Sequence, residues 1–275
     1  MQTGNRLSLA YLTVHGIDPV EQVDIAAAAG FDDVGLRIVA PTHLAIDYGI
    51  IGNPSRIREI RHACDSRGIG VLDLEVITLA PGFDARRFDA ALDTAAELGT
   101  RFVQVVCEDA DRARAAAGLA QLCAAAGGRG LRVALEFMRF RTVKTLASAL
   151  SLVEEAGAPN AGVLVDAMHL ARSGGEPADV AAAPPDRIAY MQLCDAPLAN
   201  PPVEQMAHES RTDRLYPGEG ELPLSALLDA LPPAVPISVE VPRSIHADRT
   251  MAERAKLAAD ASRAWLAKYR SRSAR

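Results

Sequence analysis

The 275-residue chain is poor in cysteine and in aromatic residues. Its four cysteines, Cys64, Cys107, Cys123 and Cys194, lie far apart and form no C-x-x-C pair, which argues against a disulfide framework or a zinc knuckle. Aromatic residues make up only 4% of the chain, so Ala, Val, Leu and Ile must build the core. The sequence has no apolar run near the ~20 residues that a membrane helix needs and no signal-peptide pattern at its start. We therefore predict a cytoplasmic protein without a membrane partner.

Basic residues are also in the minority, with 29 Lys and Arg against 35 Asp and Glu and a net charge of -6. A nucleic-acid-binding domain normally carries a basic surface, so we expect no nucleic-acid partner. The one basic cluster is the C-terminal segment 268–275. We expect residues 1–270 to form one domain and residues 271–275 to form a disordered basic tail.

Short β-rich apolar runs alternate with Ala-rich segments of helical periodicity along the whole chain. Eight such runs occur, at residues 7–12, 33–38, 71–76, 102–106, 132–136, 162–166, 188–193 and 237–241. Helices are expected between them, near residues 19–29, 54–67, 84–98, 110–127, 142–157, 175–183, 223–230 and 248–268. Eight strand–helix units in a chain of this length predict an α/β fold, a single-domain (β/α)8 TIM barrel, with a doubly wound open sheet as the alternative. The long irregular stretch 195–222 is expected to be functional.

Acidic residues recur where the predicted strands end, which is where a barrel of this kind places its active site. They are Glu75, Glu136, Asp166 and Glu240, and Gln192, Asp195 and His169 lie near the same ends. An unpaired buried carboxylate is costly, so each acid must pair with an arginine, cap a helix or share a cation. Several at corresponding strand ends favour the cation, and oxygen-rich ligation favours Mg²⁺ or Mn²⁺, with Co²⁺ tolerated.

The second half of the chain resembles a known family. The motifs that carry this are Leu135-Glu136, Val165-Asp166-Ala-Met-His169, Met191-Gln192-Leu-Cys-Asp195, Pro217-Gly-Glu-Gly220 and Val239-Glu240. Together they are similar to the xylose isomerase-like TIM barrels, which include sugar isomerases and epimerases, inosose dehydratases and 3-dehydroshikimate dehydratases. Gln192 stands where most relatives have a histidine ligand, and it resembles the 3-dehydroshikimate dehydratase branch. Arg37, by contrast, stands where strand 2 of many relatives ends in a glutamate.

The resemblance implies roles for individual residues. Glu136, Asp166, Gln192 and Glu240 would bind the divalent metal ion, and Glu136, Glu240 and His169 would be catalytic. Substrate contacts would come from His169, Arg214, Arg211, Asp195, Glu75 and His15, with His43 a weaker candidate. Other interpretations stay open: His169 as a helix-start residue, Arg214 paired with Glu209 or Asp213, and Glu75 in a structural pair.

A divalent ion can polarise a ketone and its neighbouring hydroxyl. A carboxylate or His169 can then remove the proton from the carbon that is next to the ketone and bears this hydroxyl. The resulting metal-stabilised enediolate can be reprotonated or can expel a hydroxyl. The first expectation is therefore a sugar isomerase or epimerase acting on a small sugar-like hydroxyketone. The alternatives are a dehydratase of the 3-dehydroshikimate or inosose type and a non-catalytic polyol-binding barrel. Barrels of this family often pair, so a homodimer is also an expectation.

Overall fold

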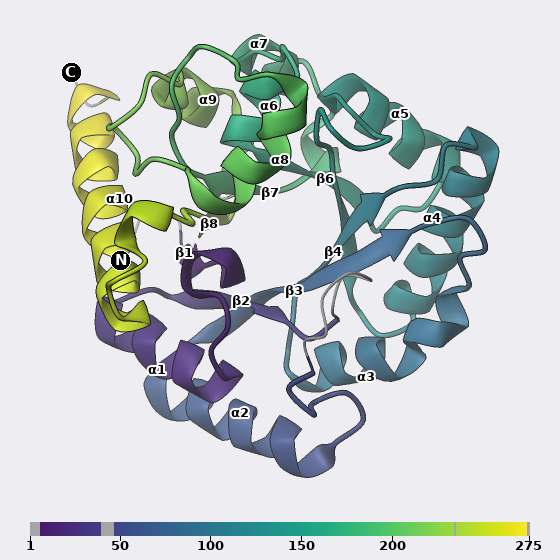
Figure 1. Cartoon of the computed structure of the whole chain (residues 1–275). Helices are drawn as coiled ribbons and strands as arrows, with labels where there is room; N and C mark the ends of the chain where they lie inside the picture. The colour runs from purple at the N-terminus through teal and green to yellow at the C-terminus, as the bar shows by residue number, and fades with distance from the viewer. Residues whose placement is uncertain (1–5, 40–46, 234, 274–275) are drawn as a thin grey trace.

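The computed structural model describes residues 6–39, 47–233 and 235–273. Its strands form one closed parallel barrel in chain order (Figure 1). They are β1 (Leu7–Leu9), β2 (Asp33–Arg37), β3 (Gly70–Leu79), β4 (Phe102–Cys107), β5 (Arg132–Glu136), β6 (Ala161–Asp166), β7 (Ile188–Leu193) and β8 (Ile237–Val239). The pairing of β1 with β8, in which Leu7 lies opposite Ile237, closes the sheet. The predicted (β/α)8 barrel is therefore confirmed, and the open sheet is excluded.

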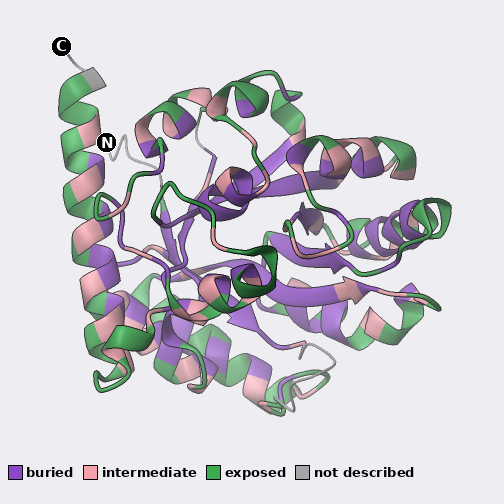
Figure 2. Cartoon of the chain, turned by 45° about the horizontal axis from the view of Figure 1, so that its top comes forward, coloured by how far each residue is buried: buried purple, intermediate pink, exposed green. Residues whose placement is uncertain are grey.

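The helices surround the barrel, and their apolar faces cover the outer side of the strands (Figures 1 and 2). They are α1 (Pro19–Ala29), α2 (Pro54–Arg67), α3 (Asp89–Glu97), α4 (Arg112–Gly127), α5 (Leu146–Ala156), α6 (Ala167–Arg172), α7 (Pro177–Ala181), α8 (Val203–Thr212), α9 (Leu224–Ala230) and α10 (Met251–Ser273). Short 3-10 helices lie at Tyr11–Val14, Ala85–Phe88, Pro185–Arg187 and Ser244–His246. None of these described helices is long and apolar enough to cross a bilayer.

The ends of α1 show why the sequence forms helices where it does. The Asp18 side chain accepts a hydrogen bond from the backbone N–H of Val20 at 2.9 Å, and Pro19 occupies the first helical position. Gly30 ends the helix with a φ of 82°, a left-handed conformation that costs glycine little. Pro19 and Gly30 are signals that the sequence itself provides, and the bounds agree with the helix expected at residues 19–29.

The structure differs from the sequence expectations at two places. Helix α10 continues to Ser273, so residues 271–273 extend a helix and do not belong to a separate tail; residues 274–275 lie outside the described chain. The stretch 195–222, expected to be irregular, contains α8. The rest of this stretch is a loop, and one carboxylate accepts hydrogen bonds from several of its backbone N–H groups.

That carboxylate belongs to Asp195, which follows β7 and is 1% exposed. It accepts hydrogen bonds from the backbone N–H groups of Ala196 at 2.9 Å, Gly218 at 2.9 Å and Leu222 at 3.1 Å. Leu215 also pairs with Asp195 through a backbone bridge. Asp195 therefore holds the loop that follows α8 against the carboxyl end of the barrel.

Gly220 lies too close to Asp195 to carry a side chain. A Cβ atom there would lie 2.4 Å from Asp195 Oδ1 and 2.5 Å from the carbonyl oxygen of Ala196. We therefore expect Gly220→Ala to lower the free energy of unfolding by about 1–3 kcal/mol through overpacking. The measurement is urea unfolding followed by circular dichroism.

Gly128→Ala is the control, because the added Cβ would meet its nearest atom at 3.8 Å and the φ of -60° suits alanine. It should change the free energy of unfolding by less than about 1 kcal/mol. Equal stabilities for the two variants would contradict the close packing of Gly220 against Asp195.

Candidate active site

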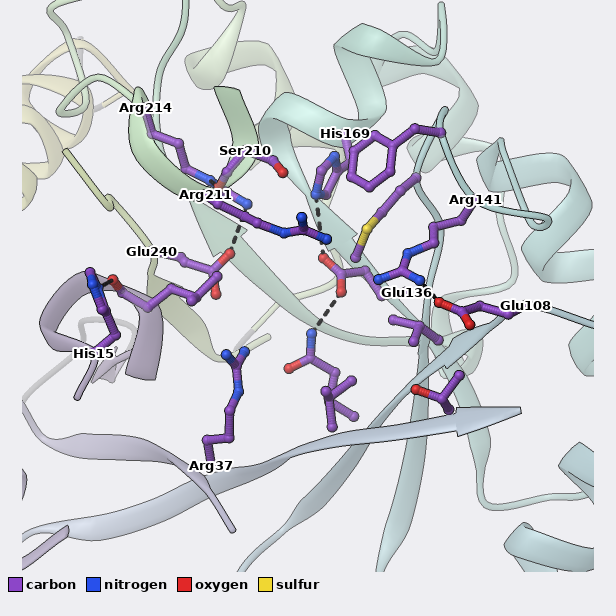
Figure 3. A pocket seen from close by; sticks show the side chains of 17 residues that line it. His15, Arg37, Glu108, Glu136, Arg141, His169, Ser210, Arg211, Arg214 and Glu240 are labelled. Carbon is purple, nitrogen blue, oxygen red and sulfur yellow. Dashed lines mark hydrogen bonds and ion pairs between the residues drawn. The ribbon is translucent and has the colours of Figure 1, made fainter. Parts of the chain in front are cut away.

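A cavity of about 360 Å³ opens at the carboxyl ends of the strands. Figure 3 shows its polar side chains converging from several strands and from the segments after them. Six of the residues expected from the sequence line it: His15, Glu136, His169, Arg211, Arg214 and Glu240. Asp166 and Gln192 are fully buried beside it. The barrel thus brings together residues that are separated by more than 200 positions in the chain.

Two carboxylates of the expected ligand set each accept a hydrogen bond from a neighbouring amide. Glu136, the last residue of β5, accepts from Nε2 of Gln104 at 2.7 Å (Figure 3). Glu240, the residue after β8, accepts from Nε2 of Gln192 at 3.0 Å. Each glutamate is 3% exposed. Both carboxylates are therefore oriented by donors that the strands hold in place.

Asp166, the last residue of β6, has both oxygens engaged. Oδ1 accepts the backbone N–H of His169 at 2.8 Å, which makes Asp166 the N-cap of α6. Oδ2 accepts from the guanidinium of Arg214. The capping interaction places the His169 ring in the cavity, with Nε2 3.7 Å from Oε1 of Glu136 and with Phe140 packed edge-on at a centroid distance of 5.8 Å.

Arg214 is 1% exposed and contacts two of the three carboxylates. Besides Asp166, it pairs through Nη2 with Oε2 of Glu240 at 2.8 Å (Figure 3). Its expected partners from the sequence, Glu209 and Asp213, are engaged elsewhere, since Glu209 pairs with Arg172 at 2.7 Å. The guanidinium of Arg214 is therefore part of the acidic cluster and is only partly available to a substrate.

The buried charges change the pKa values of this cluster. Burial, and then repulsion by Glu240 and Asp166, raise the pKa of Glu136 well above its ordinary range. Burial likewise raises the pKa of Glu240 to about 8, although Arg214 opposes the shift. Burial opposes ionisation of Asp166 too, but the charge of Arg214 and the interactions with His169, including the hydrogen bond from its backbone N–H, outweigh it and lower the pKa of that carboxyl. Burial lowers the pKa of His169 to about 4, so its imidazole is neutral at pH 7.

This donor set fits a divalent cation. Glu136, Asp166 and His169 each offer one ligand atom, and these atoms lie within 4.8 Å of one another. Oε1 of Gln192 is buried without a hydrogen-bond partner among the described residues, and an unsatisfied buried oxygen beside carboxylates suits a hard metal ion. A cation would also remove the repulsion that raises the pKa of Glu136. The expected ligand set of Glu136, Asp166, Gln192 and Glu240 stays a prediction: the first two belong to this group of close ligand atoms, and Glu240, which accepts from Gln192, lies next to it.

A second ion pair lies on the other side of the cavity. Arg37, at the end of β2, donates from Nη2 to Oε2 of Glu75 at 2.7 Å, and its guanidinium lies 4.5 Å from the centre of the Tyr11 ring. Glu75 is fully buried and does not line the cavity, whereas Arg37 does. Glu75 therefore forms the structural pair that the sequence left open as an alternative. Because Glu75 does not line the cavity, it does not occupy the place expected of a substrate-contacting residue.

Two other expected contacts, Asp195 and His15, lie in different surroundings. Asp195 lies outside the cavity lining and organises the loop described above, so the expectation that it binds substrate is replaced by a structural role. His15 lines the cavity but is exposed, with Nδ1 3.2 Å from the carbonyl oxygen of Leu12. His43 lies outside the described residues.

Arg211 and Arg141 reach the cavity from the opposite wall to Arg37 (Figure 3). Arg141 forms an ion pair with Glu108, and burial, followed by the nearby charge of Arg211, lowers its pKa. Within the described part of the chain, the guanidinium of Arg211 has no hydrogen bond or ion pair. Arg211 is therefore the cavity cation that is left for a ligand.

Sequence reasoning missed Gln104. It stands in the middle of the apolar run Phe102-Val-Gln-Val-Val106, and an amide inside an apolar strand is the same signal that drew attention to Glu136. Its Nε2 fixes Glu136, while its Oε1 is buried without a partner among the described residues. Gln104 lies inside its strand and not at the carboxyl end, so it falls outside the set of strand-end residues.

Residues 23–269 match the family model described as xylose isomerase-like TIM barrel. The chain belongs to this family. The resemblance inferred from the strand-end motifs is thereby confirmed, and the match includes the N-terminal half, where the motifs were weakest.

Two curated relatives and one solved structure illustrate what the chain is similar to. It is 32% identical over 239 residues to a 3-dehydroshikimate dehydratase of Pseudomonas aeruginosa, which covers 80% of the chain but only 35% of that relative. It is 27% identical over 195 residues to an inosose isomerase of Bacillus velezensis, covering 66% of the chain and 68% of the relative. The crystal structure of IOLI protein with a zinc atom has a TM-score of 0.81 at 20% identity, covering 96% and 99% of the two chains. The chain thus spans about a third of the length of the dehydratase.

The carboxylate set predicts metal binding, which is the first property to measure. We expect the chelator-treated protein to bind about one Mn²⁺ ion per chain in isothermal titration calorimetry. Glu136→Gln and Asp166→Asn should each weaken binding by at least about 10-fold, because each removes a charged ligand.

Glu108→Gln is the matched control. It also removes a carboxylate from the cavity wall, but Glu108 pairs with Arg141 and lies outside the ligand set. Its Mn²⁺ affinity should stay within about threefold of the unsubstituted protein. An equal loss in all three variants would mean that the cavity attracts cations only through its total charge.

Proposed function

We propose that the chain is a divalent-metal-dependent dehydratase that acts on a hydroxyketone carrying a carboxylate, of the 3-dehydroshikimate type. The observation that carries the proposal is the charge of the cavity. Arg37 is neutralised by Glu75 and Arg141 by Glu108. The three carboxylates of the cluster and two arginines remain, with a net charge of -1. A bound divalent ion would bring the net charge of the cavity to +1. That charge is on Arg211.

An unpaired guanidinium at the rim favours an anionic substrate, because a planar carboxylate can accept two hydrogen bonds from it. A neutral ketose would leave Arg211 without a counter-charge. The sequence by itself ranked a sugar isomerase or epimerase first; the position of Arg211 and the likeness to dehydratases favour the lyase.

The chain's own residues supply the remaining requirements of a β-elimination. The C–H bond next to the ketone breaks, a C=C bond forms, and the hydroxyl on the following carbon leaves with a proton as water. His169 is neutral at pH 7 and faces the cavity, so its Nε2 is in the form that can accept the carbon-bound proton. Arg211 would hold the carboxylate and thereby fix which C–H bond faces His169. The metal ion, when bound, polarises the ketone.

An isomerase or epimerase of an inosose-like ketone is the second candidate, and the likeness to an inosose isomerase favours it. Both candidates begin with removal of the same type of proton, so they differ in what happens next. Proton NMR in D2O with Mg²⁺-loaded protein separates them, using 3-dehydroshikimate, inosose and common ketoses as the panel. We expect water loss and a catechol product from 3-dehydroshikimate only. Deuterium uptake by a ketose or an inosose without water loss would support the isomerase instead.

Substitution of Arg211 tests the source of the preference for a carboxylate. Arg211→Gln should lower kcat/KM for 3-dehydroshikimate by about 10- to 100-fold, mainly through KM, because one charge-assisted hydrogen-bonded contact is lost. Arg139→Gln removes an exposed arginine outside the cavity lining and should change kcat/KM by less than about twofold. A normal KM in Arg211→Gln would assign the carboxylate to another group.

A further inference from the structure

Arg214 occupies an unusual position for an arginine, between two carboxylates that are expected to bind a metal ion. It contacts Oδ2 of Asp166 and, at 2.8 Å, Oε2 of Glu240. The other oxygens of these carboxylates are also engaged, by the backbone N–H of His169 and by Gln192. Each carboxylate oxygen of Asp166 and Glu240 therefore has a donor from the protein.

The guanidinium is fixed from behind and cannot swing away without breaking several contacts. Its Nε donates to the carbonyl oxygen of Ser210 at 2.8 Å, and Nη1 lies 3.3 Å from the Cys194 sulfur. The backbone N–H of Arg214 donates to the carbonyl oxygen of Pro242 at 3.2 Å. An arginine held at both its backbone and its guanidinium will remain in the cluster when a metal ion arrives.

A cation fixed at this place has two opposite effects. Without metal, its charge offsets part of the mutual repulsion of the buried carboxylates Asp166, Glu240 and Glu136. With metal, it repels the ion and competes for the same carboxylate oxygens. At an effective dielectric constant of ~20, unit charges about 4 Å apart interact strongly enough to change an affinity by roughly 1000-fold, so repulsion by Arg214 is sufficient to lower the metal affinity by at least about 10-fold.

We propose that Arg214 is an internal counter-cation that stabilises the metal-free site and weakens metal binding, so that the metal ion remains exchangeable. The inference rests on the metal dependence in the proposed function. It assigns Arg214 a role in setting the metal affinity, distinct from the binding of substrate by Arg211. Loss of the arginine should therefore tighten metal binding. If Arg214 only oriented the ligands, its loss would weaken metal binding.

The test compares Arg214→Met with the unsubstituted protein after chelator treatment, using Mn²⁺ titration by calorimetry and by electron paramagnetic resonance of free Mn²⁺. We expect Arg214→Met to bind Mn²⁺ at least about 10-fold more tightly. Its metal-free form should melt at a lower temperature, and saturating Mn²⁺ should raise the melting temperature by more than in the unsubstituted protein. Neither readout depends on turnover.

Two variants serve as controls. Arg214→Lys keeps the charge and should bind Mn²⁺ within about threefold of the unsubstituted protein. Arg211→Met removes a cavity arginine that does not touch the carboxylates, and it should also stay within about threefold. If Arg214→Met does not fold, Arg214→Gln is measured in its place and should show the same tightening.

The outcomes separate the inference from the proposed function. Weaker or equal Mn²⁺ binding in Arg214→Met or Arg214→Gln would overturn the counter-cation role and would make Arg214 a ligand-orienting residue. An unsubstituted protein that binds no Mn²⁺ would overturn the metal site and this inference together. Tightened binding in a protein that turns over no member of the substrate panel would support the inference while the proposed reaction failed.

Discussion

The repulsion between three buried carboxylates is the constraint on which the carboxyl end of this barrel depends. Glu136, Asp166 and Glu240 are each at most 3% exposed, and carboxylates this close cannot all be charged without a cation between or beside them. The surrounding structure supplies part of what they need. Gln104 and Gln192 donate to the two glutamates, the N-terminus of α6 donates to Asp166, and Arg214 contributes a positive charge.

The parallel barrel makes this cluster possible because register places strand ends side by side. Asp166 lies opposite Gln192 in the pairing of β6 with β7, and Gln192 lies opposite Ser238 in the pairing of β7 with β8. A residue at the end of one strand therefore reaches its neighbours across the barrel mouth, whatever the length of the connecting helix. The outward faces of the same strands pack against the helices (Figure 2), so polar side chains inside the mouth do not disturb the main core.

The barrel and the clustering of acids at the strand ends could be predicted from the sequence because both leave local signals. Strand runs, helix-end residues such as Pro19 and Gly30, and charged residues inside apolar runs can each be recognised from the local sequence alone. Pairings made across the barrel leave no such signal. Arg214 lies 48 positions from Asp166 and 26 from Glu240, while its sequence neighbours Glu209 and Asp213 were the obvious partners; only the fold chooses between them. The structural role of Asp195 could not be predicted for a related reason. Its hydrogen-bond donors are backbone N–H groups of a loop that follows another helix.

In the proposed function, the residues at the strand ends carry out the proton transfer and a residue at the cavity rim selects the substrate. The carboxylates, His169 and the amides come from strand ends that the fold fixes, and their arrangement suits removal of a proton next to a ketone in any member that keeps them. Arg211 comes instead from α8, a helix in the connection after β7, where length and sequence can change without disturbing the barrel. The ion pairs Arg37–Glu75 and Arg141–Glu108 cancel the other charges of the wall. If the proposed function holds, selection for an anion rests on one arginine, and a single change in α8 would move this site toward a neutral substrate while leaving the proposed proton transfer in place.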